Sequence, residues 1–199
     1  PQLSAERVWS ETKKLLLAEN PAKVWQLMVA QGVLAHFMPE AHDVARLEKM
    51  VVLEKQYTEG TALRRLAALL EPNPAIADKV TVRLHLSNRE AETLWLLVQL
   101  PSLLHSKLDP VPLRRLIYTH GNEAVRDGLL LLAARDGVAI NAAWQLAQDW
   151  QAPNFPLRGE DMIALGIKPG PEMGAVLKAV ETWWIEADFH PTKAECLTA

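Results

Sequence analysis

The chain has 199 residues, of which 49% are hydrophobic and 23% are charged, with a formal net charge of −3 and a pI near 6.1. This composition is typical of an ordinary soluble globular protein and excludes an intrinsically disordered chain. The mild acidity argues against a surface that binds nucleic acid everywhere, although it permits a local basic face.

The single cysteine, Cys196, excludes an intramolecular disulfide and a cysteine metal cage. This cysteine usage predicts a reducing, cytoplasmic compartment, and we expect Cys196 itself to lie in a frayed terminus. The longest apolar run, residues 128–134, is too short to span a bilayer and predicts a buried helix. Because the chain begins at Pro1 and not at Met, we expect it to be part of a longer protein.

Helical periodicity dominates the chain, and most periodic segments follow a residue that suits a helix N-cap. In segment 76–84, Val80, Val82 and Leu84 alternate as in a strand, but its helical surroundings favour a helix. Residues 151–158 contain two prolines and predict a linker. We therefore predict an all-α, elongated array of about ten helices. The helices expected before the linker cover residues 4–17, 20–31, 43–56, 61–70, 76–84, a segment that opens at 87, 109–121, 122–135 and 140–150.

The segment from Phe155 to Trp184 predicts two helices joined by a turn. The first is short and apolar, the turn is rich in glycine and proline, and the second helix opens at Pro171, which suits a first helical turn. The first N–H groups of that second helix can receive a phosphate. Phosphate binding and a plain helix connection remain alternatives for this turn.

Four segments, in this order, resemble the C-terminal part of class II tRNA nucleotidyltransferases, the CCA-adding enzymes related to bacterial poly(A) polymerases. Residues 3–17 resemble a neck helix with the pattern ERI…EL.K.L, and residues 20–40 resemble the two helices that follow it. Residues 84–90 (LHLSNRE) resemble a recurrent LSN(K/R)E turn. Residues 155–184 resemble a tail with the pattern G.DL..LG..PGP..G..L.

The resemblance implies a division into the remainder of a neck domain (1–35), a helical body (36–150) and a helical tail (151–199). In the family, transfer of CMP and AMP from CTP and ATP uses a Gly-Ser pair and an Asp-x-Asp that holds Mg²⁺. Neither motif occurs here. We therefore expect no catalytic residue, metal or cofactor in this portion, which should be inactive alone, whereas Mg²⁺, CTP and ATP belong to the parent enzyme's head.

The implied partner is tRNA, and no membrane partner is expected. Phosphate contacts position RNA, so cationic side chains are the candidates, although each can equally belong to a solvated face. The cationic candidates of the body and tail include Arg64, Arg65, Arg83 and Arg126. From all the candidates we select as RNA-binding residues Arg89, Arg114, Arg115, Arg158 and Lys168, together with Gly170 and Gly174 at the tail turn.

Glu6 and Arg7 match the family's neck helix, where they would brace the helix that selects the nucleotide. Alternatively, they form a surface ion pair with Glu11 and Lys14, one turn away on the same helix. No oligomeric state follows from these patterns.

Two further features favour structural over functional interpretations. The dipeptide His42-Asp43 lacks the partner residues of a metal-dependent phosphohydrolase, and Asp43 suits a helix N-cap. The seven tryptophans fall mostly among aliphatic residues and predict core packing, although the adjacent Trp183 and Trp184 cannot both face one core. Two rival functions remain: the C-terminal part of a poly(A) polymerase, and a helical protein-interaction module without an RNA role.

Overall fold

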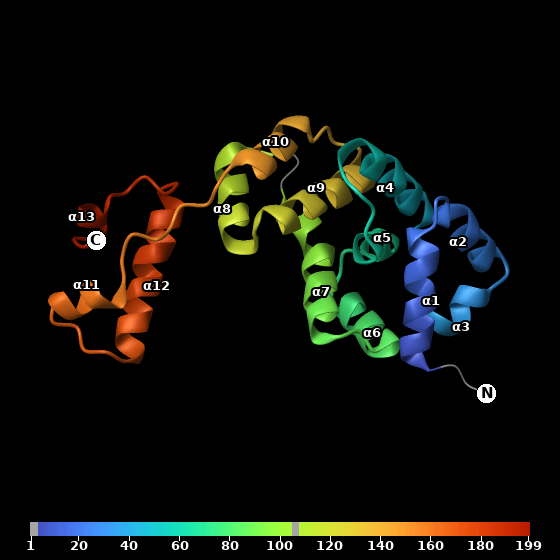
Figure 1. Ribbon diagram of the computed structural model, residues 1–199, viewed down its shortest axis with the longest axis horizontal. Helices are drawn as coiled ribbons and strands as arrows, with labels where there is room; N and C mark the ends of the chain where they lie inside the picture. The colour runs from blue at the N-terminus through green and yellow to red at the C-terminus, as the bar shows by residue number, and fades with distance from the viewer. Residues whose placement is uncertain (1–3, 105–107) are drawn as a thin grey trace.

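The computed structural model describes residues 4–104 and 108–199 and is all-α, which confirms the predicted fold class. The described residues contain thirteen helices and no strand, and Figure 1 shows them spread along one long axis. The helices are α1 (Ala5–Leu17), α2 (Pro21–Ala30), α3 (Val33–Phe37), α4 (Val44–Tyr57), α5 (Ala62–Leu69), α6 (Pro74–Leu84), α7 (Asn88–Leu103), α8 (Pro110–His120), α9 (Asn122–Asp136), α10 (Asn141–Asp149), α11 (Gly159–Ala164), α12 (Pro171–Glu186) and α13 (Lys193–Cys196).

Local capping chemistry places most helix starts where the sequence predicts them. Ser4 caps α1 by accepting from the N–H of Arg7, and Asp43 caps α4 by accepting from the N–H of Arg46. Ser87 and Glu90 form a capping box at the start of α7. Segment 76–84, which was ambiguous between strand and helix, lies in α6.

Two short helices, α3 and α13, were not predicted from periodicity. They have five and four residues, so neither completes two helical turns, and an apolar period cannot be recognised over such a length. Cys196 lies in α13 and is only 2% exposed, so the prediction of a frayed terminus was wrong. A capping box of Thr192 and Glu195 fixes α13.

The main hydrophobic core extends through α1 to α10, with α9 in contact with α4, α5, α7, α8 and α10. The apolar run 128–134, predicted to be a buried helix, lies in α9 and is buried throughout. Gly128 lets α9 approach α7 closely, because a Cβ at this position would lie 2.7 Å from the Cβ of Leu100. Trp9, Leu16 and Leu47 share this core, so the packing continues across the expected boundary at residue 35.

A second, smaller core lies beyond the helix-free segment at 151–158 and joins α11, α12 and α13 (Figure 1). Trp184 is buried there with 2% exposure, whereas the adjacent Trp183 is 40% exposed, as their adjacency requires. None of the helices in the described part of the chain combines the length and the hydrophobicity that a membrane crossing needs.

Candidate nucleic-acid interface

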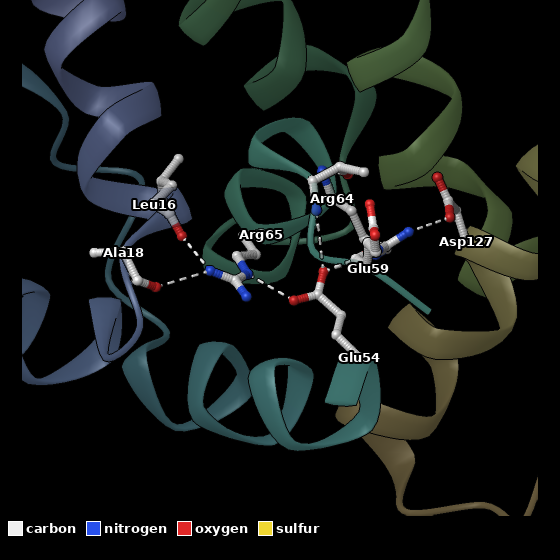
Figure 2. A network of polar contacts seen from close by, with 8 residues as sticks. Leu16, Ala18, Glu54, Glu59, Arg64, Arg65 and Asp127 are labelled. Atoms are coloured by element: carbon white, nitrogen blue, oxygen red, sulfur yellow. Dashed lines mark hydrogen bonds and ion pairs between the residues drawn. The ribbon is translucent and has the colours of Figure 1, made fainter. Parts of the chain in front are cut away.

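Arg64 and Arg65 are structural and do not face solvent (Figure 2). Both donate to the buried Glu54: the distance is 2.9 Å from Arg64 Nε to Oε1, and 2.6 Å from Arg65 Nε to Oε2. Arg64 Nη1 also contacts Asp127 Oδ1 at 2.5 Å, and Arg65 Nη1 donates to the carbonyl of Leu16 at 2.5 Å. Their exposed fractions of 2% and 8% remove both from the candidate RNA contacts.

The network formed by Glu54, Arg64, Arg65 and Asp127 connects four helices: α1, α4, α5 and α9. Its two positive and two negative side chains balance, which is the condition under which buried charges are tolerated. Burial raises the pKa of Asp127 above its usual value, while the neighbouring Arg64 opposes that rise. Glu54 was recognisable in the sequence as a charged residue at an otherwise apolar helical position, but its partners were not.

Arg114 and Arg115, two of the selected RNA-binding residues, join the tail to the body. Arg114 on α8 donates from Nε to Asp188 Oδ1 at 2.9 Å, and its Nη2 contacts the second carboxylate oxygen. Arg115 Nη2 donates to the backbone carbonyl of Glu186 at 2.6 Å. The hydrogen bond from Arg114 lowers the pKa of Asp188 and raises that of the guanidinium itself. We call this pair of contacts the clasp.

Tyr118 extends the clasp by one turn of α8. Its hydroxyl donates to Glu181 Oε1 at 2.5 Å, and its ring lies 5.8 Å from that of Trp184 and 5.3 Å from that of Phe189. Burial, together with the hydrogen bond to Glu181, raises the pKa of Tyr118 to about 12. The tail is therefore held against α8 by charge, hydrogen bonding and aromatic contact together.

The other three selected cations are exposed but lie on different elements. Arg89 is in the first turn of α7, whereas Arg158 precedes α11 and Lys168 lies in the turn before α12. The five selected cations therefore do not form a single patch. Arg83, a further candidate, pairs with Glu40 instead.

Gly170 immediately precedes α12, which opens at Pro171 as predicted, whereas Gly174 lies in the first turn of that helix and not in the tail turn. A Cβ at either glycine would meet nothing within 4 Å. Gly170 has extended backbone, with φ of 160°, so neither the packing nor the conformation requires glycine here. The N-terminus of α12 has no side-chain cap among the described residues.

Glu6 and Arg7 both lie on the exposed side of α1. Glu6 Oε1 lies 3.1 Å from His85 Nδ1, which links α1 to the C-terminal end of α6. A backbone hydrogen bond and then the contact with His85 lower the pKa of Glu6. Glu11 and Lys14 pair with each other at 2.8 Å.

Arg89 does meet another cation, Arg126, in one groove of about 840 Å³. The groove lies between α1, α5, α7 and α9. No sequence pattern indicates that these two arginines are neighbours, since 37 positions separate them. Arg126 reaches it from the second turn of α9, with its guanidinium 5.6 Å from the ring centroid of Trp144.

No three His, Cys, Asp or Glu side chains gather as a metal site among residues 4–104 and 108–199. Asp43 caps α4, as its structural interpretation predicted.

Residues 1–44 match the family described as "Probable RNA and SrmB- binding site of polymerase A". Residues 1–3 of this match lie outside the described residues. They include the start of the expected neck portion and of the segment that resembles the family's neck helix. The matched residues include the first three helices, α1 to α3.

Over 98% of its length the chain is also similar to proteins named CCA tRNA nucleotidyltransferase 1, mitochondrial. It is 24% identical to the relative from Danio rerio, 26% to that from Mus musculus and 24% to that from Homo sapiens. The chain spans about half the length of these relatives, 46% of the first and 45% of the others.

The predicted resemblance is confirmed: the chain is similar over 98% of its length to CCA tRNA nucleotidyltransferases, and residues 1–44 match an RNA-binding segment of the polymerase A family. The predicted cytoplasmic location is contradicted, because all three relatives are mitochondrial enzymes. The absence of disulfide-forming cysteines, on which that prediction rested, does not distinguish one reducing compartment from another.

Proposed function

We propose that this chain is the RNA-binding portion of an enzyme that adds CCA to tRNA 3′ ends. The similarity to CCA tRNA nucleotidyltransferases over 98% of the chain supports this proposal, together with the RNA-binding family match at residues 1–44. The parent enzyme would transfer CMP and AMP from CTP and ATP with Mg²⁺ bound to its head, and this portion would hold the tRNA.

The physical basis of the proposal is an array whose parts keep a fixed spacing. The buried network stiffens the body across four helices, and the clasp fixes the tail against α8. Exposed cations on separate elements, Arg89 on the body and Arg158 and Lys168 on the tail, then contact phosphates at separate places. Duplex RNA is recognised mainly by shape and backbone contacts, so fixed spacing selects the length and form of the tRNA.

A poly(A) polymerase portion is the second candidate function, because the family matched by residues 1–44 is named for polymerase A. The two candidates differ in the RNA that the chain prefers. A tRNA-processing portion should favour tRNA, and a poly(A) polymerase portion should bind an adenylate-tailed strand at least as well.

The test is binding of the 199-residue chain to tRNA that lacks its 3′ CCA, across a salt series. An unrelated hairpin and an adenylate-tailed strand serve as controls. We expect preferential tRNA binding whose log K falls linearly with log salt, since phosphate contacts release counterions. Absence of binding at low salt would contradict the proposal, and a preference for the tailed strand would favour the second candidate.

We also propose that this portion is inactive alone, because its sequence has neither the Gly-Ser pair nor the Asp-x-Asp. Incubation with tRNA, CTP, ATP and Mg²⁺ should give no incorporation of labelled nucleotide. Incorporation above that of a heat-denatured control would refute this.

A further inference from the structure

The groove that contains Arg89 and Arg126 holds two arginines that form no ion pair with another described residue, although the carboxylate of Glu123 lines the same groove. Three of its other charged residues are already paired: Lys13 and Glu90 with each other at 3.2 Å, and Asp127 with Arg64 at 2.5 Å. By contrast, no ion pair involves Arg89 or Arg126 within residues 4–104 and 108–199.

Arg126 is the more unusual of the two arginines. Its Nε is buried and has no hydrogen-bond partner among the described residues, a situation that costs free energy. The cation–π contact with Trp144 holds the guanidinium, and its N–H groups make no hydrogen bond to residues 4–104 and 108–199. A planar guanidinium presents these donors in the geometry that phosphate oxygens accept.

The groove walls add two features that suit the same ligand. The N-terminus of α9, at Gly121 and Asn122, lines the groove and has no side-chain cap among the described residues, so its first N–H groups can donate to an anion. Leu63 and Leu96, which are both partly exposed, provide apolar surface beside the cations, against which a sugar or a base can pack.

Charge balance distinguishes a nucleic-acid strand from a free nucleotide. After the internal pairs are set aside, the charged side chains that remain are Arg89, Arg126 and one carboxylate, that of Glu123. Burial lowers the pKa of His120, another lining residue, so its ring stays mostly neutral at pH 7. This small positive excess suits phosphodiesters with one charge each, and it is poorly matched to the multiply charged phosphates of a nucleoside triphosphate.

We infer that the groove between α1, α5, α7 and α9 binds the backbone of an RNA strand, with Arg89 and Arg126 each pairing with a phosphodiester. This inference rests on the proposed function, of which it names one contact site. The groove lies among the body helices α1, α5, α7 and α9. In Figure 1, α8 and α10 stand between these helices and the tail. The groove therefore adds an RNA contact in the body that is distinct from the exposed cations of the tail.

The experiment measures tRNA affinity for two variants that change the groove charge in opposite directions. Arg89→Gln removes an exposed cation and should weaken binding roughly tenfold at low salt, and the salt slope should fall by about one. Glu123→Gln removes the remaining carboxylate and should strengthen binding. Lys49→Gln, on the exposed side of α4, removes the same charge outside the groove and should change the affinity less than about twofold.

Arg126→Lys keeps the charge but loses the planar group, and should weaken binding while its Tm reports any loss of packing on Trp144. If the unchanged chain binds tRNA but Arg89→Gln and Glu123→Gln both behave like Lys49→Gln, the groove inference is overturned and the proposed function stands. If the unchanged chain does not bind tRNA, the proposed function fails and the inference falls with it. Titration of the unchanged chain and of Arg89→Gln with CTP and ATP completes the test. If Arg89→Gln loses nucleotide binding but keeps RNA binding, the assignment of the groove to RNA is overturned.

Discussion

Replacing Glu54 with glutamine should destabilise the chain more than any other single removal of a carboxylate on α4. Glu54 is 2% exposed and accepts from Arg64 at 2.9 Å and from Arg65 at 2.6 Å. Glutamine occupies the same volume but has no charge, and its amide nitrogen is a donor that would face a guanidinium. The variant would leave two buried arginines with only Asp127 as a counter-charge.

The size of the effect follows from the burial of the broken pair. Removing one partner of a buried ion pair costs about 3–5 kcal/mol, because the remaining charge stays desolvated. We expect a loss of about 3 kcal/mol, since Asp127 still neutralises part of Arg64. In a protein of this size, a loss of 1 kcal/mol lowers Tm by about 2–4 °C, so Tm should fall by about 6–12 °C.

The assay is urea unfolding followed by far-ultraviolet circular dichroism, with the m-value compared between variants. Glu48→Gln, which changes an exposed carboxylate on the same helix, is the matched control and should stay within about 0.5 kcal/mol. A loss below about 1 kcal/mol for Glu54→Gln, with an unchanged m-value, would refute the reasoning that the network depends on its central carboxylate.

Three further predictions concern other parts of the chain. Burial opposes ionisation of Glu90, but hydrogen bonds from Trp9, Ser87 and Lys13 outweigh it and lower the pKa of Glu90 from 4.5 to about 2. The ionised carboxylate therefore stabilises the folded chain fully above pH 4.5, and this stabilisation declines as pH falls towards 2. The difference in unfolding free energy from Glu90→Gln should shrink across that window, and a constant difference would contradict it. Gly128→Ala should destabilise by about 1–3 kcal/mol through its contact with Leu100, whereas Gly174→Ala should stabilise by up to about 1 kcal/mol, both measured in urea. Arg114→Ala should speed amide hydrogen exchange in α11 to α13 but not in α9. If exchange in α11 to α13 is the same as in the unchanged chain, the clasp does not hold the tail.

Local signals predicted much of the fold, because helix caps depend on residues three positions apart. Ser4 and Ser87 illustrate this: each sequence pattern specified a hydrogen bond that the structure contains. Helices α3 and α13 are too short for a periodic pattern: the resemblance of residues 20–40 implied a helix at α3, but α13 was missed.

The functions of individual arginines were much harder to predict, because their partners are distant in sequence. Arg114 pairs with a carboxylate 74 residues later, and Arg64 with one 63 residues later. A cation in a sequence is equally compatible with an RNA phosphate, a buried carboxylate or solvent, and only the packing of helices decides among them. For the same reason, the meeting of Arg89 and Arg126 in one groove could not be predicted.

Hydroxyl-radical footprinting of tRNA bound to the 199-residue chain tests the central claim, that body and tail hold one tRNA at fixed spacing, most directly. The account predicts two separated protected stretches of backbone. Arg89→Gln should weaken one of them, and the double change Arg158→Gln with Lys168→Gln should weaken the other. A single protected stretch, or loss of the same protection in both variants, would contradict it.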